Sequence, residues 1–292
     1  MLRTNISWMI NDYCTSECSY CPTRLRGGVE PMAIEKYLYF AQTAIDHYKS
    51  LGRDINWAFN GGEPLEMFDF PMLLKLCKDN GGTIDLTTNG GKLWMDWWAI
   101  EPHIDTLHLS YHYWQNPKLI NFIIETFQKK NKSIDVMVPI RPDFFDEDLD
   151  RALEIELKYK FIVSKTVLYT MADSIAGMFP YTAQQLRIIR GEELVQEQQH
   201  YIDTTFQDRF KERIENNPVY TGMWCNAGIE CLSISHQGWA SGSQCNNRPL
   251  GNIWSNQFVF PTSPHACGMQ ACISSSDQAI TKFSSNLLAL KN

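Results

Sequence analysis

The chain has 292 residues, of which 44% are hydrophobic and 20% charged, an ordinary globular composition that can bury a sizeable core. Its formal net charge of −7 offers no basic footprint for a phosphate backbone, which disfavours a nucleic-acid-binding role. The first residues lack the apolar segment of a signal peptide, and no apolar run reaches the roughly 20 residues that span a bilayer. We therefore expect a cytoplasmic protein without a membrane partner, whose nine cysteines indicate metal or redox chemistry ahead of disulfides.

Strand and helix patterns alternate through the first two thirds of the chain. The strand patterns cover 2–10, 54–62, 83–91, 105–112, 133–140 and 164–171, and the helical patterns between them cover 31–52, 70–82, 93–100, 117–131 and 146–159. Successive β–α units predict an α/β fold with a parallel sheet and helices on its outside. Right-handed crossovers can curl such a sheet into a partial (β/α)6 barrel, with the chemistry at the carboxyl ends of the strands.

The composition changes toward the C-terminus. Residues 182–217 are rich in Gln, Glu and Arg and predict helix, whereas the chain beyond Tyr220 is rich in Gly, Ser and Asn and carries five of the nine cysteines. We expect two units, a barrel over residues 1–217 and a small cysteine-rich module over residues 218–292.

Three cysteines lie within eight residues directly after the first predicted strand, in "YCTSECSYCPTR". A four-iron cluster ordinarily takes one thiolate per iron, so Cys14, Cys18 and Cys21 would leave one iron open to a small-molecule ligand. A structural zinc site that adds a histidine to the same three cysteines is the alternative.

This CxxxCxxC spacing, with the aromatic Tyr20 before the last cysteine, resembles the signature of the radical S-adenosylmethionine (radical SAM) superfamily. The resemblance implies a partial (β/α)6 barrel and a [4Fe–4S] cluster whose open iron binds the amino and carboxylate groups of SAM. Reductive cleavage of SAM then gives a 5′-deoxyadenosyl radical that abstracts hydrogen from a substrate. A non-catalytic iron–sulfur electron carrier is the alternative of another class, and the three-cysteine set argues against it.

The resemblance also implies which residues contact SAM. The stretch "NGGEP" after the second strand resembles the GGE motif that contacts the SAM amino group, and Ser110 stands where relatives use Ser or Thr near the ribose or methionine end. Arg141 could bind the SAM carboxylate bidentately, or could be a solvated loop arginine. The cofactor-binding prediction is Tyr20, Asn60, Gly61, Gly62, Glu63, Pro64, Ser110 and Arg141.

Two further stretches have competing interpretations. Thr87–Gly90, after the third strand, could line the pocket or form an Asn-Gly turn. The aromatic run from Tyr111 to Trp114, after the fourth strand, could stack on a substrate or serve packing. No residue stands out from its neighbours as a catalytic acid or base.

The C-terminal cysteines resemble the auxiliary-cluster module called SPASM in its full form and twitch when truncated. Five cysteines fit the truncated form with one auxiliary [4Fe–4S] cluster, and the residues carried over as ligands are Cys225, Cys245, Cys267 and Cys272. The gap before Cys245 is longer than usual, and CxxxxC stands where CxxC is common. Cys231 could replace Cys225 or one of the last pair as a ligand, and a zinc site held by four cysteines is the alternative for the set.

Relatives with such modules imply the reaction class. We expect an oxidoreductase or peptide-modifying enzyme that oxidises a peptide or protein or forms a bond in it, with an electron donor such as flavodoxin or ferredoxin. The alternative substrate is a small molecule: a sugar, an aminocyclitol or a nucleoside. The cluster loop begins at residue 14, which leaves no room before it for a leader-binding domain, so we expect a peptide to be recognised by the barrel mouth or a separate partner.

Overall fold

The structure is a computed structural model that describes residues 2–16, 18–21, 28, 32–91, 94–172, 175–191, 219–246, 248–255, 257–272 and 274–284. The strands of the barrel and its hairpin are β1 (Leu2–Met9), β2 (Arg53–Asn60), β3 (Thr83–Thr88), β4 (Thr106–Ser110), β5 (Ser133–Ile140), β6 (Ser164–Val167), β7 (Tyr169–Ala172) and β8 (Ile175–Met178). The later strands are β9 (Trp224–Cys225), β10 (Cys231–Ile234), β11 (Trp239–Ser241), β12 (Pro249–Asn252), β13 (His265–Ala266) and β14 (Lys282–Phe283). The helices are α1 (Ile34–Ser50), α2 (Phe70–Asp79), α3 (Trp94–Ile100), α4 (Pro117–Lys129), α5 (Phe145–Tyr159), α6 (Ala183–Arg190) and α8 (Ser275–Ala279), with short 3-10 turns η2 (Pro64–Glu66), η3 (Glu101–His103) and η4 (Pro142–Phe144).

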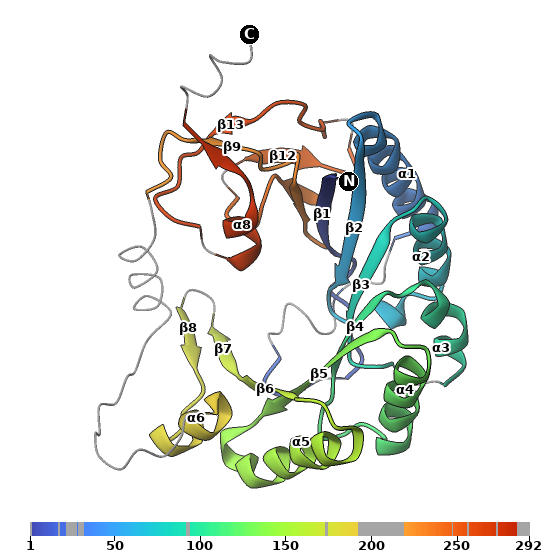
Figure 1. Ribbon diagram of the computed structural model, residues 1–292, viewed down its shortest axis with the longest axis vertical. Helices are drawn as coiled ribbons and strands as arrows, with labels where there is room; N and C mark the ends of the chain where they lie inside the picture. Colours follow the sequence, from blue (N-terminus) through green and yellow to red (C-terminus); the bar gives the residue numbers. More distant parts are fainter. Residues whose placement is uncertain are drawn as a thin grey trace.

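The six predicted strands form one parallel series. Strands β1 to β6 lie in chain order, each hydrogen-bonded to the next, and helices α1 to α5 lie on the outer side of the curved sheet (Figure 1). The predicted α/β fold with a partial (β/α)6 barrel is therefore confirmed.

Alternation along the strands builds the core between sheet and helices. In β2 every second residue is buried, which places Trp57 and Phe59 on one face beside Trp8 of β1. The Trp8 ring contacts Tyr37 and Phe40 of α1, at ring-centroid distances of 5.7 Å and 5.1 Å. Aromatic side chains of this size supply a large share of the burial that holds helix to sheet.

The sixth strand is shorter than the sequence predicts. β6 ends at Val167, and the residues that follow turn into the separate hairpin β7–β8. At the break, the Leu168 amide donates to the Tyr181 hydroxyl at 2.9 Å, and this hydroxyl in turn donates to the Ile140 carbonyl at the end of β5. The Tyr181 hydroxyl thus pairs with the Leu168 amide and the Ile140 carbonyl, which a longer β5–β6 pairing would otherwise have satisfied.

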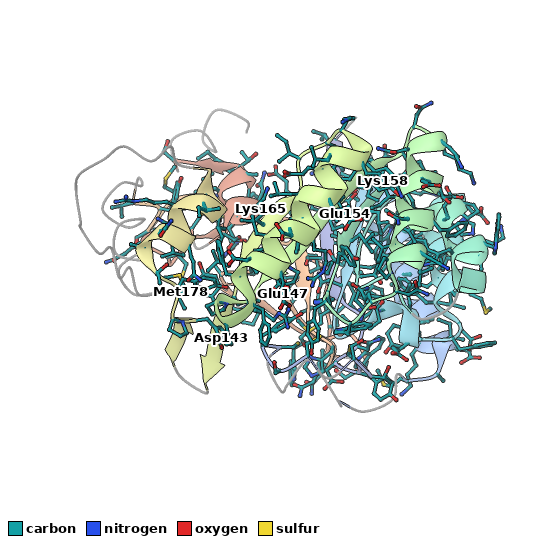
Figure 2. The ribbon with its side chains drawn as sticks, turned by 90° about the horizontal axis from the view of Figure 1, so that it is seen from below. Asp143, Glu147, Glu154, Lys158, Lys165 and Met178 are labelled. Carbon is teal, nitrogen blue, oxygen red and sulfur yellow. The ribbon has the colours of Figure 1, made fainter. Side chains whose placement is uncertain are left out.

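Helix α5 covers the last strands of the barrel on the outside (Figure 2). Glu154 and Lys158 lie along this helix, Glu147 lies near its N-terminal end, and Met178 of β8 lies close to that end in this view. Lys165 of β6 is fixed from the helix by Glu156, at 2.6 Å. The loop between β5 and α5 lies at the carboxyl end of the sheet, where the site is expected.

The C-terminal strands extend the barrel sheet. β10 pairs in parallel with β1, and β11 and β12 follow in antiparallel order, so the described residues form a nine-stranded sheet. The register opposes Asn5 to Cys231, and Thr4 donates to the Ile229 carbonyl at 2.7 Å. β1 is therefore flanked by parallel neighbours on both sides, and the predicted small C-terminal module shares a sheet with the barrel.

A second, three-stranded sheet, β13–β9–β14, carries the remainder of this module (Figure 1). The helix predicted from residue 182 begins as α6, with Thr182 and Gln185 in a reciprocal capping box, and ends at Gly191 in left-handed conformation. The rest of that predicted helix, and the predicted boundary at residue 217, lie outside the described residues. Within the part of the chain that the structure describes, no helix is both long and apolar enough to cross a bilayer.

Candidate active site

The cysteine loop after β1 is fastened to the glycine pair after β2. The Gly62 amide donates to the Asn11 carbonyl at 2.9 Å, and the Glu63 amide donates to the Tyr13 carbonyl at 2.8 Å. A Cβ at Gly61 would lie 2.5 Å from the Asn11 carbonyl oxygen, and one at Gly62 would lie 2.4 Å from that of Tyr13. The two glycines are required because the loops touch backbone to backbone.

Glu63 ties the same loop to the end of β3. Its side chain is buried, and its carboxylate accepts from the Thr88 hydroxyl at 2.6 Å, the Leu65 amide at 2.9 Å and the Asn89 amide at 2.7 Å. Burial raises the pKa of Glu63 to about 7, against the opposing effect of these hydrogen bonds. The structure places this carboxylate inside the protein, where it holds the loop after β2 to the end of β3.

A cavity of about 460 Å³ opens beside these loops. It is lined by residues at or just beyond the carboxyl ends of the six strands β1 to β6: Cys14, Ser16, Cys18, Tyr20, Cys21, Gly61, Gly62, Thr87, Thr88, Asn89, Ser110, His112, Pro139, Thr166, Val167, Leu168 and Tyr169. The three cysteines of the loop, Tyr20, the glycine pair and Ser110 thus line one cavity together with Thr87–Asn89. Asn60, Glu63, Pro64 and Arg141 are not among the lining residues.

Hydrogen-bond donors point at the sulfurs of the cysteine loop. The Ser16 amide donates to the Cys14 sulfur at 3.5 Å, and the Asn89 amide nitrogen lies 3.8 Å from the same sulfur. The Trp114 indole N–H donates to the Cys18 sulfur at 3.1 Å. Burial raises the pKa of Cys14, while the Ser16 hydrogen bonds lower it. Donors of this kind stabilise sulfur in its anionic form, which is the form that binds iron.

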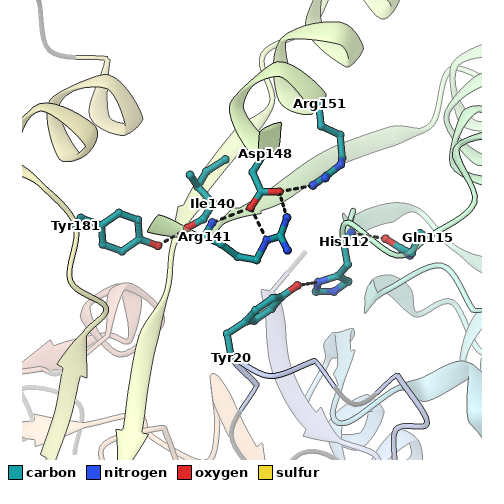
Figure 3. Close-up of polar contacts among 8 residues, drawn as sticks. All are labelled: Tyr20, His112, Gln115, Ile140, Arg141, Asp148, Arg151 and Tyr181. Atoms are coloured by element: carbon teal, nitrogen blue, oxygen red, sulfur yellow. Dashed lines mark hydrogen bonds and ion pairs between the residues drawn. The ribbon is translucent and has the colours of Figure 1, made fainter. Parts of the chain in front are cut away.

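Rings from the loop after β4 stack beside the cysteine loop. The Tyr20 hydroxyl and His112 Nδ1 are 2.6 Å apart (Figure 3), and the His112 ring is nearly parallel to the Trp114 ring at 5.7 Å. Burial lowers the pKa of His112 to about 4 and raises the pKa of Tyr20. His112 is therefore a neutral imidazole at pH 7, and its Nδ1 shares a hydrogen bond with the Tyr20 hydroxyl.

Arg141 lies at a neighbouring cavity and is already paired. Its guanidinium donates through Nε and Nη2 to the two carboxylate oxygens of Asp148, each at 2.8 Å, and Arg151 donates to the same carboxylate (Figure 3). The guanidinium also lies over the rings of Tyr113 and Phe144, at 4.0 Å and 4.3 Å from their centroids. Its predicted contact with the SAM carboxylate stays a prediction.

The five C-terminal cysteines gather in a second cluster. Cys225, Cys231 and Cys267 pack in one apolar group, and four of the five are buried. The Cys272 sulfur lies 3.4 Å from the Asp277 carbonyl oxygen, and the backbone amide of Gln244, next to Cys245, donates to the Asp277 carboxylate at 3.0 Å. Cys231, whose role the sequence left open, packs directly with Cys225 and Cys267.

Polar groups surround this second cluster. The Ser243 hydroxyl lies 2.8 Å from the Cys245 sulfur, and the Asp277 carboxylate accepts from the Gln244 amide at 3.0 Å. Burial raises the pKa of Cys231 to about 12, with a further contribution from Asp277. Burial also raises the pKa of Cys272, while Lys282 lowers it. One carboxylate oxygen of Asp277 is buried and has no hydrogen-bond partner among the described residues.

Both sets of cysteines suit iron–sulfur ligation. The first set offers three sulfurs at the wall of a cavity, and N–H groups donate to two of them. The second set offers five sulfurs, beside an Asp277 oxygen that is buried and has no hydrogen-bond partner among the described residues. In the described structure none of the nine cysteines forms a disulfide, and no three His, Cys, Asp or Glu side chains converge on a single metal ion. Cys77 is packed in the core.

Sequence reasoning missed the role of Trp114. It is 96 residues from Cys18, and an aromatic run after a strand usually indicates packing. It also missed Asp148, seven residues further along the chain, as the partner of Arg141.

The fold is similar to that of solved radical SAM enzymes. Native anSMEcpe with bound AdoMet and the Kp18Cys peptide is 13% identical over 88% of this chain and 79% of its own, with a TM-score of 0.51. SuiB of Streptococcus suis bound to its precursor peptide SuiA is 14% identical over 88% of this chain and 63% of its own, with a TM-score of 0.55. BtrN in complex with AdoMet and 2-DOIA is 14% identical over 88% of this chain and 84% of its own, at a TM-score of 0.46, too low to support an argument.

No protein-family model matches the sequence, and no curated protein matches it. At these identities the likeness establishes the fold alone: over most of its length the chain has the fold of the radical SAM enzymes anSMEcpe and SuiB.

Proposed function

We propose that this chain is a radical SAM enzyme with one auxiliary iron–sulfur cluster, and that it oxidises a peptide or protein substrate or forms a bond in it. The observation that carries the proposal is the cavity whose wall contains all three cysteines of CxxxCxxC together with Gly61 and Gly62.

Each part of this cavity has a role in the proposal. Cys14, Cys18 and Cys21 hold a [4Fe–4S] cluster, which when bound supplies the electron that cleaves SAM to methionine and the 5′-deoxyadenosyl radical. Gly61 and Gly62 lie in the wall of the same cavity, where their backbone would contact the amino group of SAM. The remaining residues position the ligand and exclude water from it.

Two other predicted residues act differently in the proposal. Ser110, at the end of β4, supplies a hydroxyl to SAM from the cavity wall. Glu63 acts on the site by fixing the loops after β2 and β3, because its carboxylate is occupied by their donors.

In this proposal the five C-terminal cysteines supply the ligands of the auxiliary [4Fe–4S] cluster. They offer five thiols for a cluster that takes four, and β10 joins the module that carries them directly to the barrel sheet. An auxiliary cluster gives the substrate radical a place to leave an electron, which favours oxidation or oxidative bond formation.

A peptide or protein is the favoured substrate because anSMEcpe and SuiB, which share the fold at TM-scores of 0.51 and 0.55, were solved with peptides bound. We place the protein in the cytoplasm, where a flavodoxin or ferredoxin can serve as electron donor.

The test of the enzyme class is anaerobic reconstitution with iron and sulfide, followed by an assay for 5′-deoxyadenosine with SAM and a reductant. We expect about eight irons per chain, four per cluster, and formation of 5′-deoxyadenosine. A chain that binds iron but never cleaves SAM would be an electron carrier, and one that binds only zinc would refute the proposal.

The substrate class is tested by deuterium transfer. Extracts of cells grown on deuterated nutrients are separated into peptide and small-molecule fractions, and each is incubated with the reconstituted enzyme, SAM and reductant. Hydrogen abstraction transfers deuterium from the substrate to 5′-deoxyadenosine, which mass spectrometry detects. Deuterium from the small-molecule fraction alone would replace the peptide with a sugar, an aminocyclitol or a nucleoside.

A further inference from the structure

Lys282 lies beside two of the five C-terminal cysteines. In the sheet β13–β9–β14, Lys282 is directly opposite Cys225, so the two side chains emerge on the same face as a cross-strand pair. Its ammonium nitrogen lies 2.6 Å from the Asp277 carbonyl oxygen, and the Cys272 sulfur lies 3.4 Å from that same oxygen. The shared oxygen keeps the ammonium within about 6 Å of the Cys272 sulfur.

The ammonium is held in this position. It donates a second hydrogen bond to the Ile280 carbonyl at 2.8 Å and lies 4.8 Å from the centroid of the Tyr220 ring. Both of these hydrogen-bond partners are backbone carbonyls, and among the described residues no carboxylate forms an ion pair with the ammonium. The lysine therefore brings a cationic group next to two thiols.

Other charged groups also face the second cluster. Arg248 donates to the Ala227 carbonyl at 2.9 Å and interacts electrostatically with Cys225. Asp277 is the acidic neighbour, and its carboxylate is directed to the Gln244 amide. His265 is opposite Cys225 on the other side, and its Nδ1 lies 3.2 Å from the Cys225 carbonyl oxygen.

We infer that Lys282 raises the reduction potential of the auxiliary cluster and so suits it to accept an electron. This inference rests on the auxiliary cluster of the proposed function. One-electron reduction makes the cluster more negative, and a nearby fixed cation stabilises the more negative state. The charge of Lys282 thus favours transfer of an electron from the substrate radical to the auxiliary cluster, without contact between Lys282 and the substrate.

The test measures the midpoint potential of the auxiliary cluster alone. Full-length protein in which Cys14, Cys18 and Cys21 are alanine is reconstituted anaerobically, so that only the second site can hold a cluster. Its reduction is followed by electron paramagnetic resonance during a redox titration. The same titration is run on Lys282→Gln, which removes the charge but keeps a hydrogen-bond donor, and on Lys282→Met, which removes both.

We expect both neutral variants to retain about four irons per chain and to be reduced at a more negative potential than the parent. Lys282→Arg, which keeps the charge, should return the midpoint close to that of the parent. Lys75→Met is the matched control, because Lys75 is an exposed lysine of α2 that pairs with Asp79, and its loss should leave the midpoint unchanged.

The possible outcomes distinguish a failure of the inference about Lys282 from a failure of the proposed auxiliary cluster. An unchanged midpoint in the neutral variants overturns the inference and leaves the auxiliary cluster standing. Loss of the cluster from both neutral variants also overturns it, since Lys282 would then serve only to cap α8. Absence of any cluster in the parent refutes the auxiliary cluster itself, and the inference with it.

Discussion

Gly62→Ala is the sharpest test of how the cysteine loop is built. The added Cβ would lie 2.4 Å from the Tyr13 carbonyl oxygen, about 1 Å short of the 3.4 Å at which ordinary contact begins. The opposing atoms are backbone, so one loop must move away from the other. That movement breaks the hydrogen bonds from Gly62 to Asn11 and from Glu63 to Tyr13.

The expected cost combines overpacking with two lost hydrogen bonds. Overpacking a tight site costs about 1–3 kcal/mol, and each backbone hydrogen bond contributes about 0.5–1.5 kcal/mol net. We therefore expect Gly62→Ala to lose about 2–6 kcal/mol in free energy of unfolding, measured as a lower urea midpoint of the metal-free protein. Because the displaced loop carries Cys14 and its neighbours, we also expect loss of about half the reconstituted iron.

Gly81→Ala is the matched control. Gly81 has a φ of +84°, and nothing lies within 4 Å of the position that an added Cβ would take, so alanine there adds backbone strain of about 1–2 kcal/mol without a clash. It should keep all its iron. If Gly62→Ala bound iron fully and unfolded at the midpoint of Gly81→Ala or above, the backbone contact described here would not support the cluster site.

Three further predictions follow from named contacts. Cys14→Ala should lower the reconstituted iron from about eight to about four per chain and abolish 5′-deoxyadenosine, and undiminished SAM cleavage would contradict its role as a ligand. Trp114→Phe keeps an aromatic ring but removes the N–H donated to sulfur, so the SAM-binding cluster should be reduced at a more negative potential. Trp98→Phe, at an exposed tryptophan, should leave that potential unchanged. Asp148→Asn leaves Arg141 without its buried carboxylate and should cost about 3–5 kcal/mol at pH 7. Burial would raise the pKa of Asp148, but the Arg141 hydrogen bonds outweigh burial and lower it, so its contribution is present above the unfolded pKa and fades as the pH falls below about 4. A stability difference from wild type that stayed constant down to pH 3 would refute this assignment.

Local sequence patterns specify the strands and helices of the barrel and the strand that each candidate site residue follows. The six parallel strands and the helices between them follow from side-chain periodicity, which is set by the geometry of each element alone. The cysteine triplet lies on one short loop, so its spacing already placed Cys14, Cys18 and Cys21 together. The glycine pair at Gly61 was readable because it ends a strand whose carboxyl end adjoins that loop.

Tertiary structure alone decided the contacts between distant segments. The parallel pairing that opposes Asn5 to Cys231 depends on register across more than two hundred residues, and nothing in the periodicity of either strand encodes it. The same holds for Trp114 at the Cys18 sulfur and for Lys282 beside the second cluster. Hydrogen bonds and charges act over a few ångströms, so which groups they join is settled only when the sheet has brought the segments together.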